Sequence, residues 1–223
     1  MRSAALLLAV GIVLTSCGAA SSVDTEAINN ATLRVRADGC GPRTGFGTGT
    51  SIGDGVVVTA AHVVAGATRV EVIDGRGDAS SAEVVWFDPA LDVAALRPTS
   101  PPSESVPLSS ARANEGDTGV VATWSAEDSI ELQEIDVVQR VSILTTDIYL
   151  DDEVQRPGLR ITATIEPGDS GAMVHLPDGG VGIVWSRSTE RADQAWTIDV
   201  PDVLARRALR SELVEPVDTG RCP

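Results

Sequence analysis

The chain from Ala31 onward consists of short apolar or alternating runs separated by glycine, proline and aspartate. Each run has the length and alternation of a β-strand. In the first half the pattern predicts strands at 33–37, 47–52, 56–59, 69–73, 82–87, 93–96 and 118–124. In the second half it predicts strands at 130–138, 140–148, 159–165, 172–176, 181–186 and 195–198. So many short strands favour an all-β fold, either a sandwich or a pair of barrels.

Few helices are expected. One turn of helix is predicted at 61–64, and a longer helix at 201–213, where apolar residues recur at helical spacing. Four prolines between 98 and 107 indicate a linker between two halves, about 31–100 and about 106–200. Both halves belong to one predicted domain that runs from 31 to 223.

Composition narrows the possible chemistry. With 223 residues, of which 43% are hydrophobic, the chain is long enough for a domain with a substantial core. Its 32 acidic residues outnumber 17 basic ones, so the net charge is −15 and nucleic acid is not expected as a partner. All the basic residues are arginine. Without lysine the chain cannot form a Ser-Lys dyad, a Schiff base or a lysine-containing phosphate loop.

The first 16 residues have the features of a secretory signal peptide, with a basic residue, an apolar run and small residues before Cys17. Leu14-Thr15-Ser16-Cys17 resembles the lipobox of bacterial lipoproteins, in which the cysteine is lipidated. We therefore expect a lipid anchor on Cys17 and a tether from 17 to 30. The protein would be exported to the bacterial cell envelope, on the outer face of the plasma membrane or in the periplasm. The alternative is an ordinary cleaved signal in which Cys17 has no role.

The chain has three cysteines, and a free thiol is a liability in an exported protein. With Cys17 assigned to a lipid, Cys40 and Cys222 remain as a pair. A disulfide between them would close a loop over nearly the whole domain and contribute about 5 kcal/mol in the chain-entropy model. Two unpaired thiols or an intermolecular bond are the alternatives. Neither cysteine has a histidine nearby, so no metal site is expected.

Three short segments contain side chains suited to nucleophilic catalysis. His62 follows an apolar strand, Asp92 directly precedes a buried strand, and Ser170 lies in a glycine-flanked turn. A serine hydroxyl is a weak nucleophile until a neighbouring base takes its proton. The order His, Asp, Ser predicts a triad in which Ser170 attacks, His62 is the base and Asp92 orients the imidazole.

The segments Thr59-Ala60-Ala61-His62, Asp92-Val93-Ala94 and Gly168-Asp169-Ser170-Gly171 resemble the motifs of chymotrypsin-like, or trypsin-fold, serine proteases. The likeness is closer to bacterial periplasmic members of the high-temperature-requirement and acid-resistance types, and it spans about Thr32 to Val200. It implies two six-stranded antiparallel β-barrels with the site in the cleft between them. No PDZ domain is expected after the second barrel.

The resemblance also implies a serine endopeptidase that acts on protein or peptide substrates through an acyl-enzyme, without a cofactor. The backbone N–H groups of Gly168 and Ser170 would bind the oxyanion. Thr164, six residues before Ser170, would form the floor of the specificity pocket, where an aspartate would select basic side chains. Small or medium apolar P1 residues are therefore expected. Trp185 and Ser186 would lie on the strand that presents its backbone to the substrate.

Three further features are expected to have structural roles outside the triad. His175 is expected to face solvent on a strand, and the acidic segment 151–153 to be a solvated loop. Asp169 is expected to bind an arginine or backbone donors. The alternative function is a catalytically silent binding or scaffold protein of the cell envelope, in which Trp185 or a closed cleft blocks the substrate.

Overall fold

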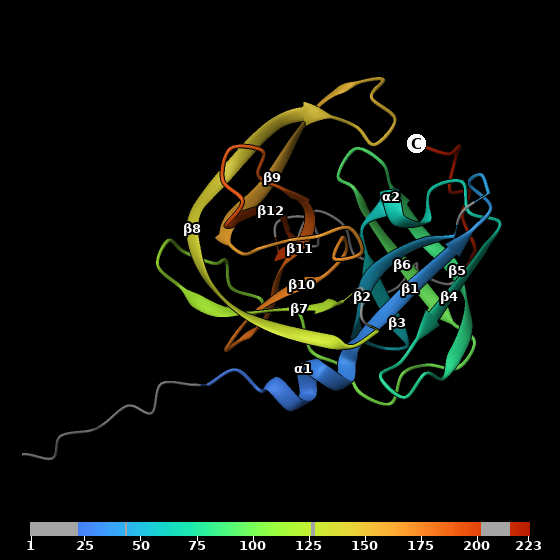
Figure 1. Ribbon diagram of the computed structural model, residues 1–223, viewed down its shortest axis with the longest axis horizontal. Coiled ribbons are helices and arrows are strands. Elements are labelled where there is room, and N and C mark those ends of the chain that lie inside the picture. The colour runs from blue at the N-terminus through green and yellow to red at the C-terminus, as the bar shows by residue number, and fades with distance from the viewer. Residues whose placement is uncertain (1–21, 43, 126–127, 202–214) are drawn as a thin grey trace, which may run out of the picture.

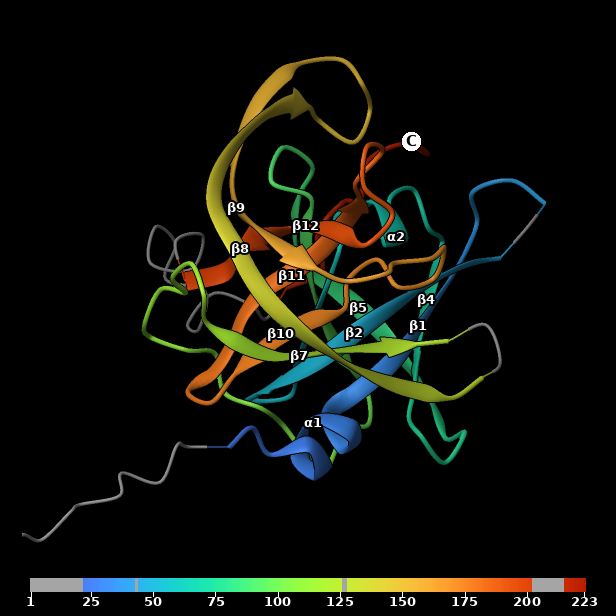
Figure 2. The same ribbon diagram turned by 60° about the vertical axis from the view of Figure 1, so that its left-hand side comes forward.

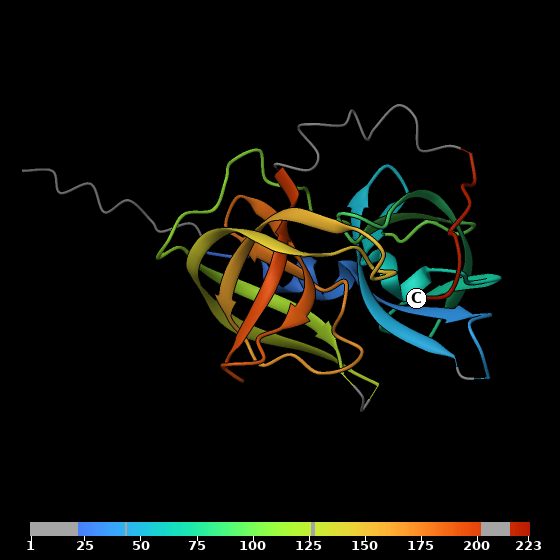
Figure 3. The same ribbon diagram turned by 90° about the horizontal axis from the view of Figure 1, so that it is seen from above.

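The fold is that of a computed structural model, which describes residues 22–42, 44–125, 128–201 and 215–223. The described chain forms two six-stranded antiparallel barrels that lie side by side (Figure 1). The view from above shows the same pairing, with the C-terminus lying on the first barrel (Figure 3). The predicted all-β, two-barrel fold is confirmed.

The first barrel is closed in the order β1-β2-β3-β6-β5-β4, with β1 (Thr32–Asp38), β2 (Gly45–Gly53), β3 (Val56–Thr59), β4 (Arg69–Ile73), β5 (Ala79–Asp88) and β6 (Val93–Pro98). The second is closed in the order β10-β11-β12-β9-β8-β7, with β7 (Thr118–Trp124), β8 (Ile130–Thr146), β9 (Glu153–Thr162), β10 (Met173–Leu176), β11 (Gly179–Arg187) and β12 (Gln194–Asp199). The helices named within the described residues are α1 (Thr25–Ala31), which leads into β1, and α2 (Ala61–Val64), which follows β3. Within the described ranges no helix has the length and apolarity that a membrane span needs.

Apolar side chains fill each barrel and also the space between the barrels. One buried cluster, around Leu33 and Leu96, fills the first barrel, and another, around Leu159 and Ile161, fills the second. A third cluster joins strands of both barrels, namely Val56, Val58, Val85, Val93 and Ala95 with Met173, Ile183, Ile198 and Val200. The two barrels therefore share a packed interface, which fixes the relative position of loops from each.

β8 differs from the prediction of two separate strands at 130–138 and 140–148. It is one strand of 17 residues that curves around the second barrel (Figure 2). Its register with β9 shifts between Val137 and Gln139, which marks a β-bulge. A bulge lets one strand bend without ending, so the polar residues at this point do not break it.

The strand predicted at 159–165 begins earlier in the structure, because Arg156-Pro157-Gly158 lies inside β9. Pro157 pairs with Ser142 and Gly158 with Val141 across the β8–β9 ladder. A β-carbon on Gly158 would lie 2.1 Å from the carbonyl oxygen of Thr197. The glycine thus allows a close approach of the β12 backbone, which is a common role for glycine inside a strand.

The segment predicted as a tether from 17 to 30 is helical in its second part, where α1 begins. The Asp24 side chain caps this helix by accepting the N–H of Ala27 at 3.0 Å. Ile28 is 2% exposed and packs with Val106 and Val120. The helix therefore docks on the protein. The predicted signal peptide, Cys17 and residues 202–213 of the predicted C-terminal helix lie outside the described residues.

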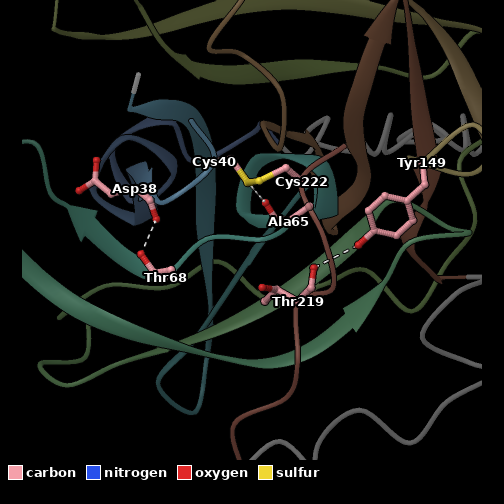
Figure 4. Close-up of a disulfide and its surroundings, with 7 residues drawn as sticks. All are labelled: Asp38, Cys40, Ala65, Thr68, Tyr149, Thr219 and Cys222. Atoms are coloured by element: carbon pink, nitrogen blue, oxygen red, sulfur yellow. Dashed lines mark hydrogen bonds between the residues drawn. A yellow bond between two sulfur atoms is a disulfide. The ribbon is translucent and has the colours of Figure 1, made fainter. Parts of the chain in front are cut away.

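A disulfide joins Cys40, just after β1, to Cys222 at the C-terminal end (Figure 4). The C-terminal tail runs over the first barrel, where the N–H of Gly66 donates to the carbonyl of Thr219 at 3.1 Å. The hydroxyl of Tyr149, from the β8–β9 connection, donates to the same carbonyl at 3.1 Å. The tail is thus held by both barrels.

Candidate active site

α2 places His62 at the end of β3, with its imidazole against Asp92. Nδ1 of His62 lies 2.8 Å from Oδ2 and 3.0 Å from Oδ1 of Asp92. The backbone N–H of His62 also donates to Oδ1 of Asp92, at 2.9 Å. One buried carboxylate therefore holds both the main chain and the ring of His62. It favours the tautomer in which Nδ1 bears the hydrogen and Nε2 is free to accept one.

A tight turn between β5 and β6 positions Asp92. Oδ1 of Asp88 accepts the N–H groups of Ala90 and Leu91, at 3.1 and 3.0 Å, and so closes the turn. Asp92 has a φ of 60°, a left-handed conformation that is uncommon for a residue with a side chain. Such a conformation persists only where the surroundings hold it. Asp88 thus shapes the turn, whereas Asp92 contacts His62.

Two glycines shape the turn around Ser170, because Gly168 has a φ of 109° and Gly171 a φ of 92°. A β-carbon on Gly171 would lie 2.1 Å from the carbonyl oxygen of Thr48 and 2.9 Å from the backbone nitrogen of Ala60. Only glycine satisfies both the conformation and the close contact. Since Ala60 is two residues before His62, the turn of Ser170 lies against the part of the first barrel that holds His62.

Two backbone N–H groups around Ser170 have no acceptor among the described residues. In the described part of the chain, neither the N–H of Gly168 nor that of Ser170 donates to a protein acceptor. The Ser170 hydroxyl likewise makes no hydrogen bond to His62 there. Catalytic hydrogen bonds are often long in substrate-free enzymes and tighten when substrate binds. Unpaired N–H groups beside a serine are the donors that a developing oxyanion requires.

Thr48, on β2, anchors the Ser170 turn to the first barrel. Its N–H donates to the carbonyl of Ser170 at 2.8 Å, and its hydroxyl donates to the carbonyl of Gly168 at 3.0 Å. The same hydroxyl accepts the N–H of Trp124 from β7, at 3.0 Å. Thr48 was not identified from the sequence. The available signal was a buried-strand pattern in which threonine alternates with small glycines.

Asp169 turns away from Ser170 and caps its own loop. Its Oδ2 accepts the N–H of Glu166 at 2.8 Å, so its partner is a backbone donor, as expected. Burial raises the pKa of Asp169 and the charges of Glu166 and Glu131 raise it further, while hydrogen bonds from Glu166 and Thr123 lower it. Asp169 thus has its hydrogen-bond partner within its own loop.

Thr164 is exposed, and its N–H donates to the side-chain oxygen of Gln133 on β8 at 2.7 Å. With Glu131, Glu166 and Asp169 it lines a cavity of about 410 Å³. The cavity beside Thr164 is thus bordered by carboxylates. That it receives the P1 side chain remains a prediction.

Trp185, on β11, lies beneath an arginine from β9. The guanidinium of Arg156 stands 4.7 Å from the centre of the Trp185 ring, and the ring packs on the apolar cluster between the barrels. The Ser186 hydroxyl donates to the carbonyl of Arg187 at 3.1 Å. Their contact with substrate stays a prediction.

His175 was expected to face solvent, and this is wrong. Its side chain is fully buried in β10, and burial lowers its pKa to about 4. Neither ring nitrogen has a partner among the described residues. It lines a cavity of about 210 Å³ with Asp24 and Ile28 of the α1 segment. The reason for the error is α1 itself, which covers this face of the barrel.

Known proteins resemble this chain in sequence. Residues 47–182 match the family model described as the trypsin-like peptidase domain. A curated serine protease of Mycobacterium tuberculosis, Rv3671c, is 30% identical over 178 residues, which are 79% of this chain and 44% of that protein. The chain therefore spans less than half the length of this relative.

Solved structures show the same fold. The active form of the Rv3671c protease superposes with a TM-score of 0.82 at 25% identity, covering 97% of this chain and 99% of that one. Its inactive form gives a TM-score of 0.72 at 26% identity and covers 82% and 90%. A serine endoprotease of Yersinia pestis gives 0.66 at 19% identity, covering 85% and 65%, and this likeness concerns the fold.

Proposed function

The chain belongs to the family of trypsin-like peptidase domains, and we propose that it is an exported serine endopeptidase with Ser170, His62 and Asp92 as its triad. The observation that supports this most strongly is that the Asp92 carboxylate accepts two hydrogen bonds from His62, one from Nδ1 at 2.8 Å and one from the backbone N–H at 2.9 Å. A histidine placed only for packing would not need a buried carboxylate aligned with its ring. The substrates are peptide bonds of proteins or peptides.

In the proposed mechanism Asp92 keeps a hydrogen on Nδ1, so that Nε2 of His62 can take the proton of the Ser170 hydroxyl. The serine oxygen then attacks the peptide carbonyl and forms the tetrahedral intermediate. His62 returns the proton to the leaving amine, which departs and leaves an acyl group on Ser170. Water, activated by the same imidazole, hydrolyses the ester. Asp92 stabilises the imidazolium at both stages without taking its proton.

The N–H groups of Gly168 and Ser170 form the proposed oxyanion hole. Both are unpaired in the described chain, and Thr48 holds the carbonyls of the same two residues toward the first barrel. Thr48 thus fixes the peptide unit that follows each donor, and we expect this to hold the two donors in place before substrate arrives. Loss of one oxyanion donor typically lowers kcat by about 10²–10³-fold.

Hydrolysis of a fluorogenic peptide library tests this proposal. Ser170→Ala should abolish hydrolysis, and Asp92→Asn should lower kcat by about 10⁴-fold because the wrong imidazole tautomer is then favoured. Ser142→Ala, an exposed serine on β8, is the matched control and should retain wild-type activity. Hydrolysis that survives Ser170→Ala would contradict the assignment. A wild-type protein that is folded but inert would favour the binding or scaffold function.

We also propose that a lipid on Cys17 attaches the protein to the membrane in the cell envelope. The support is the lipobox-like segment that ends at Cys17 and the apolar run before it. Wild-type protein should fractionate with membranes, and Cys17→Ala should be released and lack lipid by mass spectrometry. Membrane association that is equal in the two proteins would contradict the anchor.

A further inference from the structure

Arg156 is a buried arginine at the junction of the two barrels. It lies on β9, is 2% exposed, and reaches from the second barrel to the segment that holds Asp92. Nε donates to the carbonyl of Ala90 at 2.8 Å, and Nη2 donates to the carbonyl of Thr146 at 3.0 Å. Nη1 lies 4.0 Å from Oδ2 of Asp92. One side chain thus contacts both barrels beside the carboxylate that binds His62.

The environment of Arg156 keeps its guanidinium in a single orientation. The ring of Trp185 lies 4.7 Å beneath it, and a flat aromatic surface orients the planar group. Burial lowers the pKa of Arg156, whereas the charges of Asp92, Asp147 and Asp88 raise it. An arginine keeps its charge in proteins, so a fixed positive charge stands beside Asp92.

A positive charge and hydrogen bonds to the neighbouring backbone would stabilise Asp92 in its observed position. Its carboxylate is 3% exposed and its backbone is left-handed, so both the charge and the conformation cost free energy. The segment before it is attached to the second barrel at two points. One is the Arg156 hydrogen bond to Ala90, and the other is the N–H of Ile148, which donates to the carbonyl of Pro89 at 3.2 Å.

We propose that Arg156 is a positioning residue for the Asp92–His62 pair: it fixes the Asp92 segment against the second barrel and places a positive charge beside the carboxylate. This inference rests on the proposed peptidase function. It also gives Trp185 a role, because the ring that stands near the triad supports Arg156. The two barrels would then be coupled directly at the catalytic base.

The charge of Arg156 determines the direction of a pH effect. The charged groups around it are Asp88 and Asp92 of the first barrel, Asp147 of the β8–β9 connection, and His62 when protonated. A positive charge next to the pair opposes uptake of a proton, whether the proton goes to His62 or to Asp92. Removing the charge should therefore raise the pKa of the acid limb of kcat/KM.

Arg156→Gln tests the inference, with Arg160→Gln as the matched control. Arg160 lies on the same strand and its removal changes the net charge equally, but its Nη2 donates to Gln139. We expect Arg156→Gln to raise the acid-limb pKa by about 0.5–1 unit. We also expect kcat to fall roughly ten- to hundredfold with a smaller change in KM. Arg160→Gln should leave both quantities unchanged.

Arg156→Lys separates charge from geometry and is also the test if Arg156→Gln fails to fold. Lysine keeps the positive charge but cannot reproduce the planar pair of hydrogen bonds to Ala90 and Thr146. The acid-limb pKa should stay at its wild-type value while kcat falls. An acid-limb shift in Arg156→Lys would contradict the role of the charge.

NMR gives a readout that does not depend on turnover, because the chain has only two histidines. In the Ser170→Ala background, Arg156→Gln should change the chemical shifts of the His62 ring, whereas Arg160→Gln should leave them unchanged. A folded Arg156→Gln variant with wild-type kcat and an unchanged acid limb would overturn the inference. If instead wild-type protein shows no Ser170-dependent hydrolysis, the proposed function fails, which is a separate result.

Discussion

The Thr48 hydroxyl holds the turn that contains Ser170. It donates to the carbonyl of Gly168 and accepts the N–H of Trp124, so it joins the serine turn, β2 and β7 in one hydrogen-bonded unit. In a buried site, loss of such a group leaves both partners unsatisfied. The alignment of the proposed oxyanion donors, the N–H groups of Gly168 and Ser170, should therefore depend on Thr48.

Thr48→Val should lower the free energy of unfolding by about 1–3 kcal/mol, because two buried groups lose their partner. It should also lower kcat. Thr50→Val is a close control, since Thr50 is equally buried on the same strand and its hydroxyl has no partner among the described residues. Urea unfolding and peptide hydrolysis of both variants measure the difference. Equal losses in the two variants would contradict the anchoring role.

His175 predicts an acid-sensitive stability. Burial lowers its pKa from 6.5 to about 4 in the folded state, so the unfolded chain binds a proton at a higher pH than the folded chain. The contribution is absent above pH 6.5, and it destabilises the fold as pH falls from about 6.5 to about 4. The loss reaches about 3 kcal/mol by linkage.

His175→Leu removes this titration and serves to measure it. The difference between the unfolding free energies of wild type and variant should shift in favour of the variant between pH 7.5 and pH 4.5. Packing changes affect both pH values equally and therefore cancel in that comparison. A difference that does not change with pH would show that His175 does not titrate in this range.

At the scale of elements, the alternating pattern predicted the strands of the first barrel closely. β3 and β4 have the predicted bounds, and α2 was predicted at its observed position. The second barrel was less predictable. The predicted strand began at 159, after a proline and a glycine. Gly158 is nevertheless part of β9, because the β12 backbone approaches closely there. That contact joins segments that are distant in sequence.

In the candidate site, too, contacts between segments distant in sequence were not predictable. His62, Asp92 and Ser170 stand out in the sequence because motifs surround them, and the structure pairs the first two directly. Thr48 and Arg156 lie in segments that read as ordinary strand or turn. The roles proposed for them rest on hydrogen bonds to residues of the other barrel, which no local pattern encodes.

The residue type at position 164 leads to a prediction about which P1 residue the protein prefers. With no acidic residue at this position, cleavage should follow small or medium apolar residues. Thr164→Asp should add cleavage after arginine if the residue lies at the pocket floor, and Thr189→Asp in an exposed loop should not. Wild-type cleavage chiefly after arginine would show that the carboxylates beside Thr164 set the preference instead.

At the scale of the whole molecule, the Cys40–Cys222 disulfide closes a loop of sequence separation 182. In the chain-entropy model such a bridge contributes about 5 kcal/mol, and removal of native disulfides typically costs about 2–5 kcal/mol. Reduction should lower the unfolding midpoint by roughly 5 to 15 °C in a domain of this size. The Cys40→Ser/Cys222→Ser variant should have the lower midpoint with or without reductant. A midpoint equal to that of the oxidised wild type would contradict the stabilising role.

The central claim is that the two barrels together make Ser170 a nucleophile. The most direct measurement is labelling of the intact protein by a fluorophosphonate probe, followed by mass spectrometry of the modified peptide. We predict a single adduct on Ser170, absent in Ser170→Ala and formed much more slowly in His62→Ala. An adduct on another residue, or equal labelling of Ser170→Ala, would contradict the account.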